Sequence, residues 1–311
     1  MSHKPLADMA VSMAQASEAS PDGGSGGACG LVCRFAAFSF VDRITQIEGT
    51  SRVSGLYTIP TEVSHFPVSL VAEAIGQLAA WVAMSVVDFT HRPVAALAGD
   101  TRMHRLPKAG DTLELIVAIE SCDAESIQYR GRALVEGQLV LELSDTLGSM
   151  LDILEFDEPD ALRADFALLT STGRKPGAFK GVPSPVLTDL AGEGTQRLEA
   201  NLSVPAAAEF FLDHFPRRPV FPATLMLDAQ LQLAQRLAKS LAGGPVRVQR
   251  ITNVKVRAFT APCATLVLFA EVAEPGQSDV EPILIKVGAQ AEGRTIAGAK
   301  MFFVPDSGET A

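Results

Sequence analysis

Two long apolar segments with helical spacing occur along the chain, and each is flanked by segments with the pattern of strands. Residues 66–79 read FPVSLVAEAIGQLA, and residues 221–234 read FPATLMLDAQLQLA. Under a constant offset of 155 residues, Phe, Pro, Leu, Ala and Gln recur identically, and an acidic residue recurs as Glu73 and Asp228. A period close to half the chain length indicates two copies of one domain.

Each copy is predicted to contain one long helix among several strands. The first helix is expected to begin near Pro67, and Pro222 is expected to open the second, because proline is tolerated in a first helical turn. The Gly243-Gly244 pair is expected to end the second helix as a C-terminal cap. Alternating or continuous apolar runs predict the strands. They lie at 35–49, 51–60, 112–122, 126–135 and 138–150 in the first copy, and at 195–205, 246–259, 265–274, 282–293 and 295–304 in the second.

This order of elements predicts an α+β fold in which each helix lies beside an antiparallel sheet. The predicted boundaries are a disordered tail at 1–32, a first domain at 33–151, a charged and then Gly/Pro-rich linker at 152–179, a second domain at 180–304 and a tail at 305–311.

Composition narrows the class of protein. The net charge of -10 argues against a nucleic-acid-binding surface, and 47% apolar residues allow a large core. The apolar segment 68–87 is long enough to span a membrane, but Glu73 and Gln77 within it favour a helix buried in the protein. The N-terminus lacks the features of a signal peptide. A cytoplasmic location is therefore expected, with free thiols at Cys29, Cys33, Cys122 and Cys263.

One motif occurs in the second copy alone. Residues 213–232 read DHFPRRPVFPATLMLDAQLQ, with His214 and Asp228 fourteen positions apart. Under the same offset, His214 corresponds to Ile59 in the first copy. His65 also precedes Phe-Pro, but six residues out of register, and is interpreted as a loop residue.

This motif resembles that of the 3-hydroxyacyl-ACP dehydratases of fatty-acid and polyketide synthesis. Segments after both helices and the run FSFVDRITQIEG are similar to the same family, so the resemblance covers nearly all of residues 35–304. Arg217 and Ala223 stand where the family has glycines. The resemblance implies the hot-dog fold, a curved antiparallel sheet wrapped around a long helix. For this chain it implies a double hot-dog packed as a pseudo-dimer, with sheets joined at their edges and helices side by side.

The resemblance also implies the site. Dehydration of a 3-hydroxyacyl thioester needs a base for the C2 proton and an acid for the C3 hydroxyl, which a neutral histidine and a buried carboxyl group can supply. In related dehydratases the histidine works with the carboxylate of the partner domain, so His214 is expected to pair with Glu73. Gln77 is expected to bind the hydroxyl or its water, and the first turn at Ala223 and Thr224 is expected to bind the thioester oxygen.

The mirror site would combine Asp228 and Gln232 with Ile59, which cannot accept a proton. Asp228 is expected to bind ligand at most. Arg217 and Arg218 are interpreted as part of a basic rim that binds acyl carrier protein through its phosphopantetheine arm. Neither a metal nor an organic cofactor is expected.

Other functions stay open at this point. A degenerate hot-dog that binds an acyl group or serves as scaffold for another dehydratase is the main alternative, and a hot-dog thioesterase is a weaker one. Structural roles for His214 and Glu73 also stay open, as do acyl-chain length, isomerase activity and further assembly into homo-oligomers.

Overall fold

A computed structural model of the chain describes Phe35, residues 37–273 and residues 282–306. The predicted tail at 1–32, Cys29, Cys33 and most of the predicted tail at 305–311 lie outside the described residues. Cys122 and Cys263 are free thiols, as predicted.

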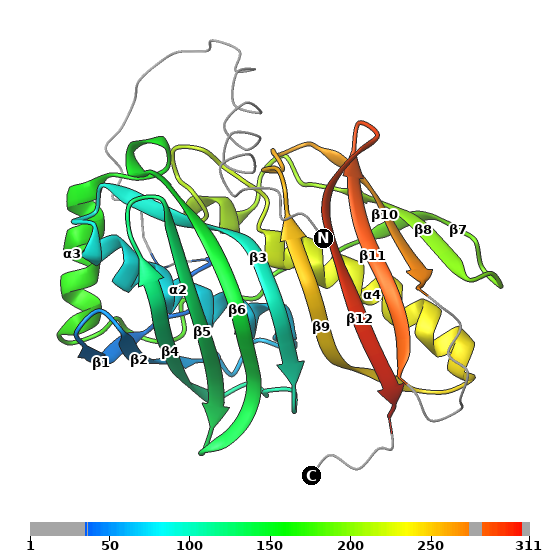
Figure 1. The fold of residues 1–311 in the computed structure, drawn as a ribbon, viewed down its shortest axis with the longest axis horizontal. Coiled ribbons are helices and arrows are strands. Elements are labelled where there is room, and N and C mark those ends of the chain that lie inside the picture. Colours follow the sequence, from blue (N-terminus) through cyan, green and yellow to red (C-terminus); the bar gives the residue numbers. More distant parts are fainter. Residues whose placement is uncertain (1–34, 36, 274–281, 307–311) are drawn as a thin grey trace.

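The strands form one antiparallel sheet of 12 strands, in the order β1-β2-β4-β5-β6-β3-β9-β12-β11-β10-β8-β7 (Figure 1). Those of the first half are β1 (Arg43–Glu48), β2 (Arg52–Thr58), β3 (His91–Met103), β4 (Thr112–Cys122), β5 (Ser126–Val135) and β6 (Gln138–Asp152). Those of the second half are β7 (Leu187–Ala191), β8 (Arg197–Ser203), β9 (Val246–Val256), β10 (Thr265–Val272), β11 (Ile283–Ala291) and β12 (Arg294–Pro305).

Two long helices lie behind this sheet, one in each half. Helix α2 (Val68–Val86) packs against β2 to β6, and helix α4 (Ala223–Ala242) packs against β8 to β12; the two helices also contact each other. Pro67 and Pro222 are the N-caps, and α4 ends at Gly243 in the left-handed conformation, which glycine adopts without a steric penalty. Both predicted helices and the predicted stop are confirmed.

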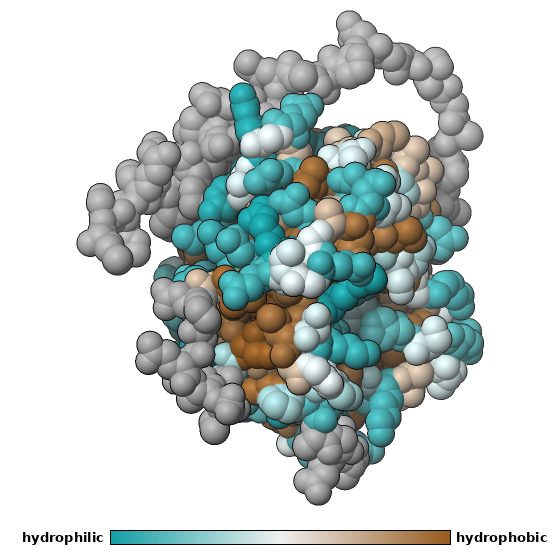
Figure 2. Space-filling model, turned by 90° about the vertical axis from the view of Figure 1, so that its right-hand side faces the viewer, coloured by the Kyte–Doolittle hydropathy of each residue, from teal (hydrophilic) through white to brown (hydrophobic). Residues whose placement is uncertain are grey.

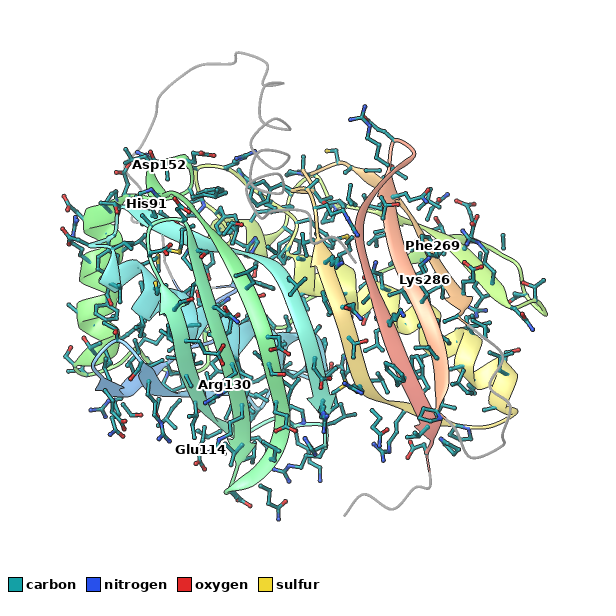
Figure 3. All side chains as sticks on the ribbon, viewed as in Figure 1. His91, Glu114, Arg130, Asp152, Phe269 and Lys286 are labelled. Carbon is teal, nitrogen blue, oxygen red and sulfur yellow. The ribbon has the colours of Figure 1, made fainter. Side chains whose placement is uncertain are left out.

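The alternation of apolar and polar residues explains which face of the sheet holds the helices. Leu113, Leu115 and Val117 of β4 are fully buried against α2, while Glu114 between them is exposed. Figure 3 labels Glu114 and Arg130 on the outer face of the first half and Lys286 on that of the second, and all three are exposed. The core therefore lies between the inner sheet face and the two helices.

Strands β3 and β9 join the two halves into one sheet. They pair antiparallel from Leu97–Lys255 to Arg102–Arg250. Arg250 donates to both carboxylate oxygens of Asp100 across this seam, over 2.6 and 3.1 Å. The first residues of β3, before Leu97, lie outside this pairing and pair with β6 alone.

Several elements differ from the prediction. The expected first strand begins only at Arg43, because the backbone N–H groups of Ala37, Phe38 and Phe40 donate to side chains rather than to a neighbouring strand. Strands β3 and β7 were not predicted. The predicted linker contains helix α3 (Pro159–Thr170), whose Phe166 stacks on Trp81 of α2.

The free end of the sheet in the second half is short. Strand β7 has five residues and pairs irregularly with β8, which limits the backbone left open at this edge. Figure 2 views the molecule from this side and shows hydrophobic residues gathered within a largely hydrophilic surface. Helix α2 is apolar and long enough to span a membrane, but 61% of its most apolar window is buried inside the protein. This agrees with the prediction of a core helix.

Candidate active site

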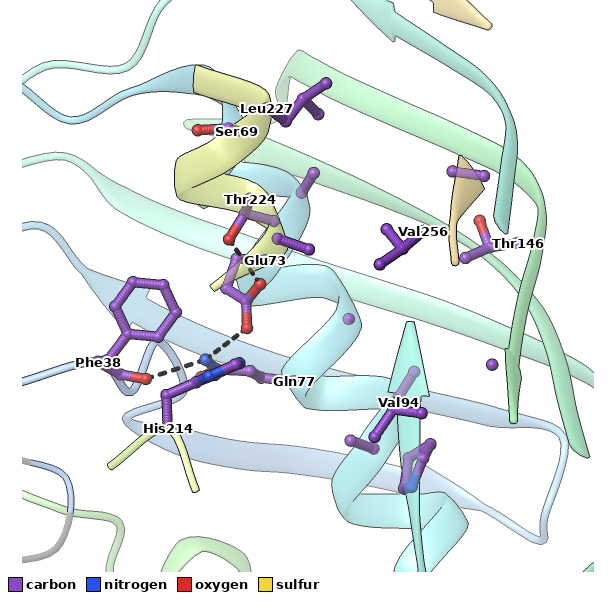
Figure 4. A pocket seen from close by; sticks show the side chains of 18 of the residues that line it. Phe38, Ser69, Glu73, Gln77, Val94, Thr146, His214, Thr224, Leu227 and Val256 are labelled. Atoms are coloured by element: carbon purple, nitrogen blue, oxygen red, sulfur yellow. Dashed lines mark hydrogen bonds between the residues drawn. The ribbon is translucent and has the colours of Figure 1, made fainter. Parts of the chain in front are cut away.

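A cavity of about 260 Å³ lies between α2, the start of α4 and the inner face of β3, β5 and β6. Its lining is mostly aliphatic and aromatic. The ionisable and amide groups in this lining come from both halves of the chain: Glu73, Gln77, Arg92, Tyr129, Asp157, Asp165, Asp213 and His214. The structure thus brings the predicted pair, His214 and Glu73, to one cavity (Figure 4).

Glu73 is held on α2 by two side-chain donors. Thr224, in the first turn of α4, donates its hydroxyl to Oε2 over 2.9 Å, and Gln77 donates to Oε1 over 3.0 Å (Figure 4). Burial raises the pKa of Glu73; the two hydrogen bonds and the positive charge of Arg92 lower it in part. The raised pKa favours a protonated carboxyl group, which is the form that can donate a proton.

Gln77 lies one helical turn after Glu73, as its spacing predicts, but both hydrogens of its amide group are engaged. One bonds to Glu73 and the other to the backbone oxygen of Phe38 over 3.0 Å, while Oε1 accepts from Phe40 N over 2.7 Å. In this arrangement Gln77 orients Glu73. Binding of the substrate hydroxyl by a Gln77 hydrogen would require one of these bonds to open.

His214 follows a short 3₁₀ turn at Glu209–Leu212 and is half-buried. Its Nδ1 lies 3.0 Å from the backbone oxygen of Val220. A carbonyl oxygen can only accept, so this contact assigns the proton to Nδ1 and leaves Nε2 as the basic nitrogen. Burial lowers the pKa of His214 to about 4, although the bond to Val220 opposes this shift. The imidazole is therefore neutral near pH 7.

The segment that precedes β1 fixes the His214 loop. Asp213 accepts from the backbone N–H groups of Ala37 and Phe38, both over 2.8 Å, and from the Ser39 hydroxyl over 3.2 Å. The Phe38 ring lies edge-on to the His214 ring, with centroids 5.4 Å apart. Sequence analysis missed this role of Asp213, although the residue adjoins His214.

Arg174 anchors the same segment from the chain between the two halves. It donates to the backbone oxygens of Phe35 and Ser39 and forms an ion pair with Asp42 at 3.0 Å. Both charged side chains are only 6% exposed. Because Phe38 and Phe40 of this segment bond to Asp213 and Gln77, the buried ion pair holds the segment that supports the site.

Arg92 of β3 is a further site residue that the sequence gave little reason to select. It forms an ion pair with the buried carboxylate of Asp157, and its guanidinium lies 4.4 Å from the ring centre of Phe215. Its charge lowers the pKa of both Glu73 and His214. Arg92 therefore stabilises the carboxylate form of Glu73 and the neutral form of His214.

The start of α4 borders the cavity at Ala223 and Thr224. The first N–H groups of a helix have no partner within it, and the helix dipole makes this end positive. These groups can stabilise an oxyanion in the cavity. Thr224 has a second contact that was not predicted, its bond to Glu73.

The two arginines of the expected basic rim are engaged by acidic residues. Arg217 pairs with Glu158 and donates to the backbone oxygen of Leu154, while Arg218 pairs with Glu155 at 2.8 Å. Neither lines the cavity. Their partners belong to the segment between the halves, so these ion pairs tie that segment to the His214 loop.

The mirror position in the second half is only partly equivalent. Gln232 donates to Asp228 over 3.0 Å, as Gln77 does to Glu73, but Asp228 does not line the cavity. Ser69 corresponds to Thr224, yet its hydroxyl has no hydrogen-bond partner among the described residues. Among the described residues, Asp228 therefore lacks a second side-chain donor of the kind that Thr224 provides to Glu73.

The histidine that acts on Asp228 is His65, to which the sequence assigned no functional role. Burial raises the pKa of Asp228, and the bond from Gln232 and the charge of His65 lower it. His65 lies in a loop, as predicted, and is exposed, whereas Ile59 is fully buried in the core. The offset does not align the two histidines, because His65 stands three residues before the first residue of α2 and His214 stands nine residues before the first residue of α4.

Within the described part of the chain, no group of three or more His, Cys, Asp or Glu side chains is placed to hold a metal ion. The chemistry that this site can perform with its own groups is proton transfer, by Nε2 of His214 and the carboxyl group of Glu73.

Comparisons with known proteins place this chain in a family. A family model described as ApeI-like, ApeI dehydratase, matches residues 191–281. The 3-hydroxyacyl-[acyl-carrier-protein] dehydratase FabZ of Bacillus velezensis is 32% identical over 117 residues, which are 34% of this chain and 82% of that protein. The enzyme of the same name from Thermomicrobium roseum is 32% identical over 127 residues, or 37% of this chain and 84% of that protein.

Solved structures with the hot-dog fold match most of the chain. The dehydratase domain of PpsC from Mycobacterium tuberculosis has a TM-score of 0.51 and 15% identity, covering 86% of this chain and 99% of that domain. The 12:0-ACP thioesterase from Umbellularia californica has a TM-score of 0.51 and 13% identity, covering 85% of this chain and 96% of that enzyme. At these identities the two structures show the fold alone. Because the FabZ relative is 32% identical and 82% covered, the chain belongs to the hot-dog dehydratase family.

Proposed function

We propose that this protein removes water from 3-hydroxyacyl thioesters of acyl carrier protein to give 2-enoyl thioesters, with one competent site per chain. The observation that carries the proposal is the cavity shared by His214 and Glu73, with Glu73 fixed by Thr224 and Gln77. FabZ relatives act on the substrate that their name states, and their similarity to this chain supports the same substrate class here.

The proposed architecture is a double hot-dog, with domains at 33–151 and 180–304 packed as a pseudo-dimer. The shared order of elements, the pairing of β3 with β9 and the contact between α2 and α4 support it. In this arrangement His214 of the second domain works with Glu73 of the first. Asp228, which lies away from the shared cavity, has no catalytic role in the proposal.

Each step of the reaction has a group that suits it. Nε2 of His214 takes the proton from C2, and the carboxyl group of Glu73 gives its proton to the C3 hydroxyl. The C2–C3 double bond forms as the C3–O bond breaks, and water leaves. The N-terminal turn of α4 stabilises negative charge on the thioester oxygen. No metal or organic cofactor enters these steps.

Acyl carrier protein is the proposed partner, and the cytoplasm is the proposed location. Arg217 and Arg218, which sequence analysis assigned to a basic rim, could contact the carrier only if their ion pairs with Glu158 and Glu155 rearrange.

A mass-spectrometric assay with a 3-hydroxyacyl-ACP tests the function. Loss of one water from the acyl group supports the proposal. Release of the free acid would identify a thioesterase instead, and an unchanged acyl group would favour the scaffold alternative.

A pair of histidine variants then identifies the site. His214→Ala should lower the rate of dehydration by a factor on the order of 10² or more, as expected for loss of a general base. His65→Ala is the matched control, because His65 lies in an exposed loop outside the cavity, and it should keep most of the activity. Loss of activity in His65→Ala with normal turnover in His214→Ala would move the site to Asp228.

A further inference from the structure

The cavity contains hydroxyl groups that the proposed dehydration does not use. Tyr129 and Thr146 both line it, from the adjacent strands β5 and β6. They are direct partners in the register of these strands, so their side chains lie side by side on the inner face of the sheet. Two neighbouring residues with hydroxyl groups therefore belong to the cavity lining on the side of the sheet.

Tyr129 is the member of this pair that lies beside the carboxyl group of Glu73. The Tyr129 hydroxyl lies 3.3 Å from the position that a Cβ atom would occupy on Gly76, and Gly76 follows Glu73 by three residues on α2. Positions three apart share one face of a helix, so Tyr129 packs next to Glu73. Burial raises the pKa of Tyr129, and the charge of Glu73 raises it further. The phenol therefore remains a neutral hydrogen-bond donor.

Thr146 is the member of the pair that lies farther from Glu73. Figure 4 shows Thr146 and the Glu73–His214 pair on opposite sides of the pocket, with Val256 and Val94 also in its lining. The residue is 5% exposed, and its Oγ1 has no hydrogen-bond partner among the described residues. The hydroxyl groups of two other lining residues, Ser69 and Thr260, are in the same state.

An unsubstituted acyl chain has no polar atom that could form hydrogen bonds with these hydroxyl groups. A buried hydroxyl without a partner costs about 1–3 kcal/mol, whereas valine has the shape of threonine and no such cost. The neighbouring lining residues Ile127, Leu143 and Leu147 are apolar, as a site for an alkyl chain would require. A polar atom on the ligand would satisfy Thr146 and remove the cost.

We propose that this cavity accepts an acyl chain with an oxygen substituent beyond C3, a hydroxyl or keto group, and that Thr146 and Tyr129 bind that oxygen. Thr146 can donate to a keto oxygen or exchange hydrogen bonds with a hydroxyl group, and Tyr129 can do the same. The proposal rests on the proposed function, because it concerns the substrate of the same site. It favours partly reduced, polyketide-type chains over saturated fatty chains.

Binding of unreactive analogues tests this inference separately from catalysis. The probes are amide analogues of N-acetylcysteamine thioesters that carry octanoyl, 5-hydroxyoctanoyl or 7-hydroxyoctanoyl groups. They lack both the C3 hydroxyl and the thioester, so neither dehydration nor hydrolysis occurs. Affinities are measured by isothermal titration calorimetry for the wild-type chain, Thr146→Val and Thr252→Val. Thr252 is the control because it is a buried threonine that does not line this cavity.

We expect the wild-type chain to bind at least one hydroxylated analogue more tightly than the octanoyl analogue. Thr146→Val should weaken that binding by on the order of tenfold and leave the octanoyl affinity unchanged, as for the loss of one matched hydrogen bond. Thr252→Val should change neither. Equal effects of Thr146→Val on all analogues, or tighter wild-type binding of the octanoyl analogue, would overturn the inference. Absence of turnover in the dehydration assay would overturn only the proposed reaction.

Discussion

Replacing Glu73 with glutamine should abolish most of the dehydration activity without damaging the fold. Replacing Asp228 with asparagine should leave both the activity and the fold nearly unchanged. The two residues occupy the same position in the internal repeat, and each accepts a hydrogen bond from a glutamine four residues later. They differ in surroundings, since Glu73 shares the cavity with His214 and Asp228 does not. The comparison therefore separates proton chemistry from the shared structural role.

The expected size of the effect follows from the contacts of Glu73. An amide cannot deliver the proton that the leaving hydroxyl needs, so the rate should fall by a factor on the order of 10² to 10⁴. The fold should persist, because one amide oxygen can still accept from Gln77, and the Thr224 hydroxyl can rotate to accept from the new amide group. The free energy of unfolding should change by about 1 kcal/mol or less.

Two measurements check this prediction on the same samples. Turnover of a 3-hydroxyacyl-ACP is followed by mass spectrometry, and stability is followed by urea unfolding at pH 7. Asp228→Asn should retain nearly full activity and similar stability. If Asp228→Asn is inactive and Glu73→Gln is active, then His214 works with the carboxylate of its own half, and the cross-domain assignment is wrong.

Two further predictions concern pH and the support of the site. The pKa of His214 is about 4 in the folded chain, below the usual 6.5. Between these pH values the unfolded chain therefore binds more protons than the folded chain. The stabilising contribution of neutral His214 should be lost as pH falls from about 6.5 to 4. The difference in urea stability between the wild-type chain and His214→Asn isolates this effect, and a difference independent of pH would contradict it. Arg174→Met should lower the free energy of unfolding by about 3–5 kcal/mol, because it leaves Asp42 buried without its cation. The double variant with Asp42→Asn should recover part of that loss, and equal stability of the single and double variants would show that the ion pair is not the cause.

The sequence alone determined the two long helices, the stop at Gly243 and the repeat that relates Glu73 to Asp228. These features depend on local periodicity and on the backbone preferences of proline and glycine, which a linear pattern records. The same is true of most strands, because burial on one face imposes alternation. The resemblance around His214 also identified the family, and the comparisons confirm it.

Tertiary structure decided which of these residues meet. Strand β3 was missed because its Ala-, Gly- and Pro-containing sequence has a weak strand pattern, and its pairing with β9 involves residues about 150 positions away. Arg92 and Asp213 act through contacts with distant segments, which no local spacing encodes. The proximity of His65 to Asp228 likewise depends on packing rather than on the repeat, since the two histidines stand at different distances from the helices that follow them. The sequence thus determined most secondary-structure elements and the reactive side chains. Long-range pairing and packing determined how those side chains are arranged and how their pKa values shift.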